Sequence, residues 1–195
     1  IRQYCMIRLW GCLMPDENIT SAPKVDIAII GDGCAGLSLA AQAASLPAHA
    51  IHVLSPQSNS PDQDHVWGYW QMDWLKDVAP LAFKTWHKWV IQTVDTEVEM
   101  QAHQHPYKAI KRHNWLAHCR IHAKKNGVNF HSDMSSIDDF PSEKIFDSRP
   151  PKSRPNMMVQ HFIGWEVRAE AGSFNDGIAI LMDFRCDQSR GVHFI

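Results

Sequence analysis

The sequence predicts an α/β fold in which a parallel sheet, begun by a βαβ unit, carries an inserted sheet-rich domain. Two short apolar runs, 25–30 and 50–54, are typical of buried parallel strands. The alanine- and leucine-rich segment between them is typical of a helix, which completes a βαβ unit of about 30 residues. Beyond residue 65, short apolar runs separated by polar turns predict mostly strands.

A Gly-x-Gly-x-x-Gly loop joins the first strand to the helix. Gly31 allows the tight turn out of the strand, Gly33 allows a pyrophosphate to approach the backbone, and Gly36 allows close helix–strand packing. Free amides at the helix start and the positive end of the helix dipole favour phosphate. We therefore predict a dinucleotide site at Gly31, Gly33, Cys34, Ala35 and Gly36; the alternative is a glycine-rich turn in an unrelated α/β domain.

Two residues depart from the usual dinucleotide pattern. An acidic residue commonly ends the second strand and binds the adenosine ribose, whereas this chain has Ser55, followed by Pro56. A serine hydroxyl can bind a ribose, but its neutral hydrogen bond is weaker than a charge-assisted one. Asp32 lies inside the loop and suits a pyrophosphate only if its side chain turns outward. Weaker retention of the cofactor is the hypothesis that follows.

The remaining elements are predicted from local patterning. Polar residues at 55–64 indicate a loop, and the apolar residues of 82–100 indicate an extended strand in its later part. The stretch 114–126 carries an apolar stripe and precedes Gly127, which predicts a helix with a glycine cap. The other predicted strands are 128–130, 145–146, 159–167, 178–185 and 192–195.

These elements predict a discontinuous cofactor domain with a second domain threaded through it. The FAD/NAD(P)-binding domain is expected over 25–75 and 109–150, and the substrate-binding sheet domain over 76–108 and 151–195. Residues 1–24 are expected to be a disordered or non-native extension, whose first part precedes the true start. The chain stops inside a predicted strand, so we expect truncation at the C-terminus.

Composition and charge bear on partners and compartment. The chain has 195 residues, of which 45% are hydrophobic and 21% charged, as is ordinary for a globular protein. Its net charge of −2 gives no electrostatic basis for nucleic-acid binding. No run reaches the ~18 apolar residues of a membrane span. Five scattered cysteines without a Cys-x-x-Cys pair indicate a reducing compartment, and we expect a cytoplasmic protein.

A metal site is not predicted. His118 and His122 have the i, i+4 spacing of metal ligands, and Cys119 lies between them. Two histidines without a third ligand at matching spacing make a weak site. A chain with 12 histidines also contains such pairs by chance.

Longer motifs are more specific than the glycine loop. They are Gly31–Gly36, His65–Trp70, Ile145–Pro150, Gln160–Val167, Phe174–Asp176, Ile180–Arg185 and Asp187–Gln188. Through these residues the chain resembles the bacterial lycopene cyclase family of flavoproteins, from about residue 25 to its end. The glycine loop is shared by very many flavoproteins, whereas the blocks 160–167 and 181–188 are far more particular. The similarity covers about the first half of such an enzyme.

The resemblance implies an FAD-binding fold close to that of aromatic hydroxylases and geranylgeranyl reductases. It implies a lycopene β-cyclase of carotenoid synthesis, in which protonation of a terminal double bond gives a carbocation, a β-ionone ring closes and a proton leaves. The FAD has to be reduced, with NAD(P)H as reductant. The substrate is lycopene or a related acyclic carotenoid, which dissolves in membranes, so peripheral association with the inner membrane is expected.

The family's acidic catalytic motif and its later glycine-rich segment lie beyond the strand at 192–195. The chain as given is therefore expected to be inactive. Two other functions remain open. One is an FAD-dependent oxidoreductase of the same fold, either a monooxygenase or a prenyl reductase. The other is an inactive fragment that only binds a dinucleotide.

Aromatic residues after the second strand are candidates for the substrate pocket. His65, Trp67 and Trp70 could line it, because aromatic faces suit both a polyene and a carbocation. The alternative is a core aromatic cluster beside a surface histidine. The segment 83–89 mixes tryptophan with lysine, which suits a membrane interface, and a half-buried strand is its alternative.

Two aspartates at the ends of predicted strands complete the candidate site. Asp147 resembles the family's strand end beside the flavin, where ligands of doubly wound sheets gather; alternatively it caps the following bend. Asp183 lies in an apolar strand, where burial would raise its pKa and suit a catalytic proton donor. The alternative for Asp183 is a solvent-facing position.

Overall fold

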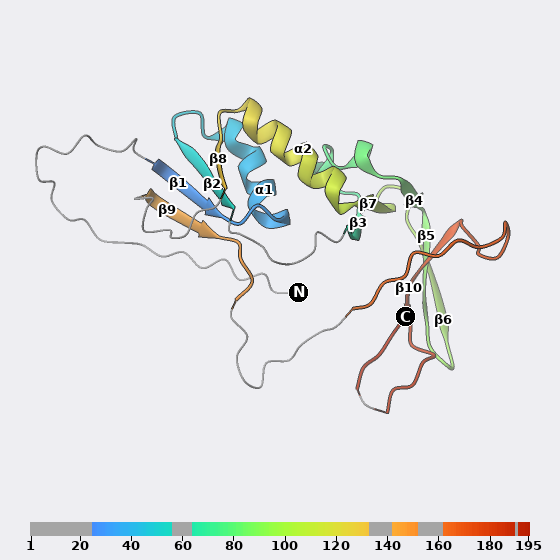
Figure 1. The fold of residues 1–195 in the computed structure, drawn as a ribbon. Coiled ribbons are helices and arrows are strands. Elements are labelled where there is room, and N and C mark those ends of the chain that lie inside the picture. The colour runs from blue at the N-terminus through green and yellow to red at the C-terminus, as the bar shows by residue number, and fades with distance from the viewer. Residues whose placement is uncertain (1–24, 56–63, 133–141, 152–161, 190) are drawn as a thin grey trace, which may run out of the picture. The chain divides into compact units, whose positions relative to one another are not determined.

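The computed structural model describes residues 25–55, 64–132, 142–151, 162–189 and 191–195. The chain divides into two compact units, drawn in Figure 1. Unit 1 comprises 1–64 and 112–152, and unit 2 comprises 65–111 and 153–195. The first boundary follows residue 64, whereas the predicted boundary follows residue 75. The strand at 66–70 therefore belongs to unit 2. The predicted extension 1–24 lies outside the described residues.

Unit 1 is a parallel sheet with its helices on one face, which confirms the predicted α/β class (Figure 1). The strands run in the order β8-β2-β1-β9, and β1 lies between β2 and β9. The elements are β1 (Val25–Ile30), α1 (Cys34–Ala40), η1 (Ala41–Ser45), β2 (Ile51–Ser55), α2 (Arg112–Lys125), β8 (Asn129–Ser132) and β9 (Ser142–Asp147).

The core of unit 1 lies between the sheet and the two helices. Ile29 and Val53 are fully buried on the helix-facing side of the sheet, against Ala40 and Ala123 of the helices. Alanine at both helix positions permits a close approach of helix to sheet, since a larger side chain would hold the two apart. Ile27 and Ile29 of β1 belong to this core, while Ala28 and Ile30 are buried with Leu54 in a second cluster.

Gly127 ends α2, as the sequence predicts. Its φ of +80° lies in the left-handed region, and its amide donates to the carbonyl of Lys124 at 3.1 Å. The amide of Val128 donates to the carbonyl of Ala123, also at 3.1 Å. This pair of bonds is the Schellman arrangement, which satisfies carbonyls at the end of a helix.

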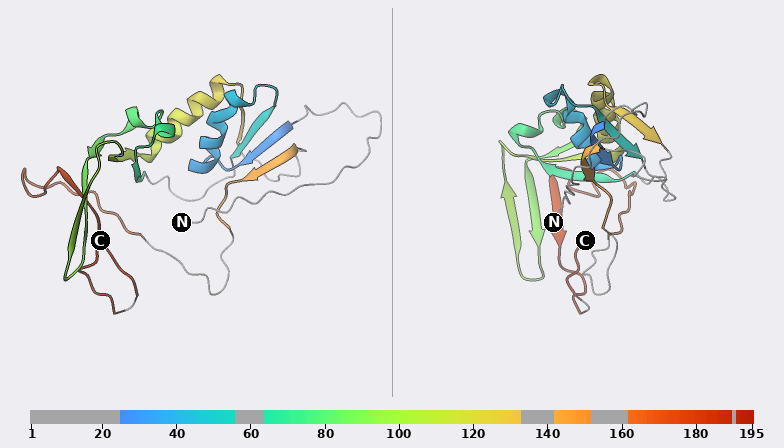
Figure 2. Two further views of the ribbon diagram at one scale, coloured as in Figure 1. Left: turned by 180° about the vertical axis from the view of Figure 1, so that it is seen from behind. Right: turned by 90° about the vertical axis from the view of Figure 1, so that its left-hand side faces the viewer.

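Unit 2 contains two three-stranded sheets. One has the order β3-β7-β4 and is antiparallel; in the other, β5 pairs with β6 antiparallel and with β10 parallel. Figure 2 shows β5, β6 and β10 side by side. The strands are β3 (Val66–Trp70), β4 (Lys84–Trp86), β5 (Lys88–Gln92), β6 (Glu97–Gln101), β7 (Tyr107–Lys111) and β10 (Ile178–Asp183). Short 3-10 turns, η2 (Asp73–Leu75) and η3 (Ala79–Leu81), connect β3 to β4.

Three predicted strands differ from the structure. The single strand expected within 82–100 is β4, β5 and part of β6, because a turn from Thr93 to Thr96 reverses the chain. Residues 162–167 form no strand, and no described strand pairs with them; 159–161 lie outside the described residues. Residues 192–195 are also not a strand, although Ile195 exchanges backbone hydrogen bonds of 2.8 and 3.0 Å with Asp183.

Among the described residues, no helix combines the length and the apolar character needed to cross a membrane.

Candidate functional site

The glycine loop connects the carboxyl end of β1 directly to the N-terminus of α1. Gly31 has a φ of +98°, a backbone conformation that favours glycine, and its amide donates to the Leu54 carbonyl at 2.8 Å. The first helical hydrogen bond runs from the Leu37 amide to the Gly33 carbonyl at 3.0 Å. The loop therefore presents the start of α1 at the carboxyl edge of the parallel sheet, where doubly wound folds bind ligands.

Space around the three glycines supports the predicted division of roles. A Cβ on Gly36 would lie 1.9 Å from the Gly31 carbonyl oxygen, so helix and loop are in direct backbone contact. A Cβ on Gly31 would lie 2.6 Å from the Ser148 Oγ. By contrast, no atom lies within 4 Å of a Cβ on Gly33. The side of the loop at Gly33 is open, which fits the approach of a pyrophosphate, while Gly31 and Gly36 are packed.

Ser148 binds the glycine loop from the end of β9. Its Oγ donates to the Ile30 carbonyl at 2.7 Å, and its amide donates to the same oxygen at 2.9 Å. The Oγ also lies 3.3 Å from the Gly31 carbonyl oxygen. Sequence reasoning missed Ser148. Its position directly after β9, which pairs parallel with β1, was the available signal.

Asp147 lies at the predicted edge of the sheet, opposite Ile30 in the β1–β9 register. Its carboxylate accepts hydrogen bonds from the Arg149 amide at 3.0 Å, Nε at 2.9 Å and Nη2 at 2.6 Å. These bonds lower the pKa of Asp147 below its usual value, so it is ionised at neutral pH. The contacts match the capping alternative, in which Asp147 stabilises the bend. A direct contact between Asp147 and a cofactor stays a prediction.

The other predicted cofactor residues occupy the same end of unit 1. Ser55 is the last residue of β2, opposite Ser132 of β8. Cys34 and Ala35 are exposed in the first turn of α1. Desolvation raises the pKa of the Cys34 thiol, while hydrogen bonding to Ser38 and the charge of Arg112 act in the opposite direction. The influence of Arg112 places a cation near the helix start, which sequence reasoning also missed.

The three predicted pocket residues do not gather on one surface. Trp67 and Trp70 are three positions apart on β3, so their side chains point to opposite faces of the strand. Trp67 is half-buried, whereas His65 precedes the strand and is exposed. Trp70 contacts Tyr107, with ring centroids 5.1 Å apart, and meets Trp89 edge-on at 6.1 Å. Because side chains alternate between the two faces of a strand, Trp67 and Trp70 lie on different faces although they are close in sequence.

An apolar groove of about 610 Å³ lies within unit 2. The β3-β7-β4 sheet contributes Val66, Gly68, Trp86 and Tyr107, and the other sheet contributes Val90, Gln92, Ile178 and Ile180. His65, Trp67 and Trp70 are not among its lining residues. On the groove wall, the rings of Trp86 and Tyr107 lie 6.0 Å apart, and Trp86 Nε1 donates to the Asp176 carbonyl at 3.1 Å.

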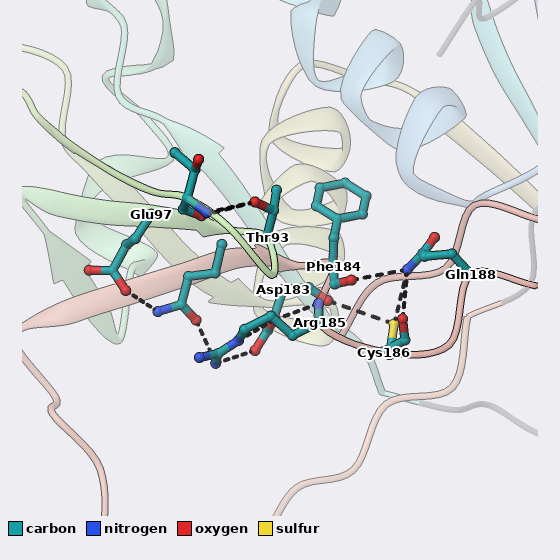
Figure 3. A network of polar contacts seen from close by, with 9 residues as sticks. Thr93, Glu97, Asp183, Phe184, Arg185, Cys186 and Gln188 are labelled. Atoms are coloured by element: carbon teal, nitrogen blue, oxygen red, sulfur yellow. Dashed lines mark hydrogen bonds and ion pairs between the residues drawn. The ribbon is translucent and has the colours of Figure 1, made fainter.

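Asp183 ends β10 and is bound by Arg185, as Figure 3 shows. Its carboxylate accepts from the Arg185 amide at 3.0 Å, Nε at 2.9 Å and Nη2 at 2.6 Å. Arg185 Nη2 also donates to Gln92 Oε1 at 2.9 Å, and Gln92 in turn binds the Glu97 carboxylate. The hydrogen bonds from Arg185 lower the pKa of Asp183 to about 2. The predicted rise in its pKa is therefore wrong, because a guanidinium two residues away stabilises the ionised form.

His118 and His122 lie side by side on α2. The rings of His118 and His122 lie 4.3 Å apart, and Trp115 stacks on His118 at 5.5 Å. In the part of the chain that the structure describes, no group of three or more histidine, cysteine, aspartate or glutamate side chains is arranged to hold a metal ion.

Comparison with solved structures finds proteins that are similar in structure to part of this chain. 2-Methyl-3-hydroxypyridine-5-carboxylic acid oxygenase is 15% identical, with a TM-score of 0.43 over 57% of this chain and 32% of the oxygenase. PqsL of P. aeruginosa, solved with 2-aminobenzoylacetate, is 9% identical, with a TM-score of 0.46 over 64% and 41%. p-Nitrophenol 4-monooxygenase of Pseudomonas putida is 13% identical, with a TM-score of 0.42 over 64% and 39%. The chain spans less than half the length of each.

The comparison with protein-family models identifies the family of the chain, which the comparison with solved structures does not. No functionally curated protein matches the chain. The family model described as "Lycopene cyclase protein" matches residues 26–195, which includes every described strand and helix except the first residue of β1. The match thus extends over both units rather than over the glycine loop alone, and the chain belongs to the lycopene cyclase family.

Proposed function

We propose that the protein is a lycopene β-cyclase that closes β-ionone rings at the ends of lycopene or a related acyclic carotenoid. Reduced FAD is its cofactor, and NAD(P)H is the reductant. The observation that carries this proposal is the glycine loop at the carboxyl edge of a parallel sheet, in a chain of the lycopene cyclase family. We assign the activity to the whole gene product.

Several features of unit 1 support the proposed binding of FAD. The open side of the loop at Gly33 leaves room for a pyrophosphate, and helix geometry leaves the amides of Cys34 and Ala35 without intrahelical acceptors. Arg112 adds positive charge near these amides. Ser55 offers a neutral hydroxyl to the ribose in place of the usual carboxylate. These residues would hold the cofactor through its phosphates more than through its ribose.

The proposed reaction is acid–base chemistry without net redox change. A proton adds to a terminal double bond, the neighbouring double bond attacks the carbocation, and loss of a proton restores neutrality. When bound, reduced FAD would supply an electron-rich ring that stabilises positive charge. The pKa of Asp183 is about 2, so its carboxyl group is ionised at neutral pH and holds no proton to donate. We therefore do not assign proton delivery to Asp183.

The groove in unit 2 is our candidate for binding one end of the polyene. Its volume of about 610 Å³ is typical of a small-molecule site. Trp86 and Tyr107 contribute aromatic rings to its lining, and such rings attract a carbocation. Desolvation raises the pKa of Tyr107, so its hydroxyl stays neutral at physiological pH.

The substrate dissolves in membranes, so we propose that the cytoplasmic protein meets the inner membrane peripherally. Trp74 and Phe83 are large apolar side chains of unit 2 that are 80% and 54% exposed. Lys111 lies over the Phe83 ring at 5.7 Å, which places a cation beside an apolar side chain. Burial alternates along β4, and Trp89 and Val90 of β5 are buried, in line with the half-buried alternative for 83–89. The exposed residues before them are therefore better candidates for membrane contact.

The test is expression of the intact gene in cells that accumulate lycopene, with pigments separated by chromatography. β-Ring products are expected. Lycopene that persists while the protein is present with bound flavin would contradict the cyclase assignment. Consumption of NAD(P)H in proportion to product would favour a monooxygenase or prenyl reductase, because a cyclase needs reductant only to keep FAD reduced. A folded protein without a flavin spectrum would contradict the cofactor assignment.

A further inference from the structure

An ion pair connects the glycine loop to α2. Asp32, the residue between Gly31 and Gly33, binds Arg120 through Oδ2 and Nη2 at 2.7 Å. The side chains of Asp32 and Arg120 are 37% and 36% exposed. The Arg120 Cζ also lies 4.7 Å from the centre of the Phe130 ring on β8. The guanidinium is therefore held in place by an aromatic ring on one side and directed to the loop on the other.

A carboxylate is an unfavourable residue in a loop that binds pyrophosphate. The phosphates are negatively charged, and two like charges in a partly desolvated site repel strongly. The ion pair turns the Asp32 side chain toward α2 and compensates its charge locally. Sequence analysis required the Asp32 side chain to turn outward, and the structure gives its carboxylate a specific partner on α2.

We propose that Arg120 is a positioning residue of the cofactor site, which makes an acidic glycine loop able to bind the phosphates of FAD. This inference rests on the proposed FAD function and deepens it. Arg120 acts through Asp32: it holds the carboxylate away from the phosphate side and cancels its charge. FAD affinity therefore depends on Arg120 only as long as residue 32 is acidic.

Lys124 offers a matched control for Arg120. It lies one turn further along α2, and its Nζ is 5.9 Å from the centre of the same Phe130 ring. The carboxylate of Asp32 forms its ion pair with Arg120. Lys124→Met removes one positive charge from the same helix and the same aromatic contact. It leaves the Asp32 pair intact.

The experiment is a double-mutant cycle on FAD affinity in the intact gene product, measured by quenching of flavin fluorescence. Arg120→Met is expected to weaken FAD binding about tenfold or more, because a carboxylate in the loop loses its partner. Asp32→Asn is expected to bind FAD at least as tightly as the wild type. The double variant Asp32→Asn/Arg120→Met should return to within about twofold of Asp32→Asn, and Lys124→Met should match the wild type.

Two further measurements separate this role from a purely structural one. Unfolding of the FAD-free proteins shows whether Arg120→Met is folded at the assay temperature. The deficit of Arg120→Met should shrink as salt is raised from about 0.05 to 0.5 M, because salt screens the repulsion. If Arg120→Met does not fold, Arg120→Lys keeps the charge without the fork, and its smaller deficit should likewise vanish in Asp32→Asn.

The outcomes distinguish the inference from the proposed function. A wild-type protein that does not bind FAD overturns both. A wild type that binds FAD, with Arg120→Met unchanged or with a deficit that Asp32→Asn fails to remove, overturns the role of Arg120 and leaves the cofactor assignment standing. A deficit of equal size in Lys124→Met would show a general effect of helix charge and would also overturn it.

Discussion

Two strand ends, β9 in unit 1 and β10 in unit 2, carry the same Asp-x-Arg motif in different surroundings. Asp147 and Asp183 each accept three hydrogen bonds from the arginine two residues on, with the same distances of 3.0, 2.9 and 2.6 Å. Both carboxyl groups consequently have lowered pKa values. The motif itself is a local device that stabilises the bend after a strand.

The middle residue and the neighbouring strand distinguish the two ends. Ser148 donates to the Ile30 carbonyl and so ties its strand end to the glycine loop. Phe184 instead packs against Phe194, with ring centroids 5.6 Å apart, and Arg185 extends to Gln92 of β5. One turn binds the glycine loop, and the other links strands of unit 2. The role of the Asp-x-Arg motif therefore depends on the residues that surround it.

The largest expected difference between the two units concerns their packed glycines. Gly36→Ala should destabilise unit 1 by about 3 kcal/mol and abolish FAD binding, because the new Cβ meets a backbone carbonyl at 1.9 Å. Gly68→Ala in unit 2 should cost less, since its Cβ meets the hydroxyl end of the Tyr107 side chain, which can rotate away. Urea unfolding and FAD titration measure both. Equal costs would show that the Gly31–Gly36 contact is not as rigid as described.

The two aspartates should differ in function although their bonds are alike. Asp147→Asn should weaken FAD binding about tenfold, near 1.4 kcal/mol, because the 147–149 turn then supports the loop less well. Asp183→Asn should keep both FAD affinity and cyclase turnover, measured in the intact gene product. A general acid would lose about 100-fold or more in turnover on such a change. A loss of that size in Asp183→Asn would restore the catalytic role that its low pKa argues against.

Substitutions of Ser148 and Phe184, the middle residues of the two motifs, should also differ in their effects on FAD binding, at a stability cost of about 1 kcal/mol. Ser148→Ala removes the hydroxyl bond to the Ile30 carbonyl while the backbone bond to that oxygen remains, so stability should fall by about 1 kcal/mol. FAD affinity should fall a few-fold with it. Phe184→Ala should lower stability through the lost contact with Phe194 and leave FAD affinity unchanged. Titration of both variants with FAD decides whether the β9 turn serves the loop.

The smallest expected effect is a pH dependence at the β10 turn. The pKa of Asp183 is about 2 in the folded chain and 3.8 for an ordinary aspartate, so its stabilising effect is complete above about pH 4. The effect disappears as the pH falls toward 2, since protonation breaks the pairing with Arg185. Urea midpoints between pH 2 and 5 should fall more steeply for the wild type than for Asp183→Asn. Parallel curves for the two proteins would contradict the ion pair.

Local patterns in the sequence predicted unit 1 better than unit 2. The βαβ unit, the roles of Gly31 and Gly36 and the cap at Gly127 depend on short-range geometry, which residue type largely fixes. The separation of 82–100 into three strands, and the division of Trp67 from Trp70, depend on partners distant in the chain. Strand propensity alone does not choose those partners.

The sequence by itself determined the glycine loop, the strands on either side of it and the family to which the chain belongs. Only the tertiary structure decided which charges meet. Arg120 binds Asp32 across 88 positions of sequence, and Ser148 binds Ile30 across 118. The pKa of Asp183 is lowered, where the sequence predicted a rise, because a guanidinium lies against its carboxylate. The physical reason is that an electrostatic environment depends on distances in space and on burial, neither of which the order of residues specifies.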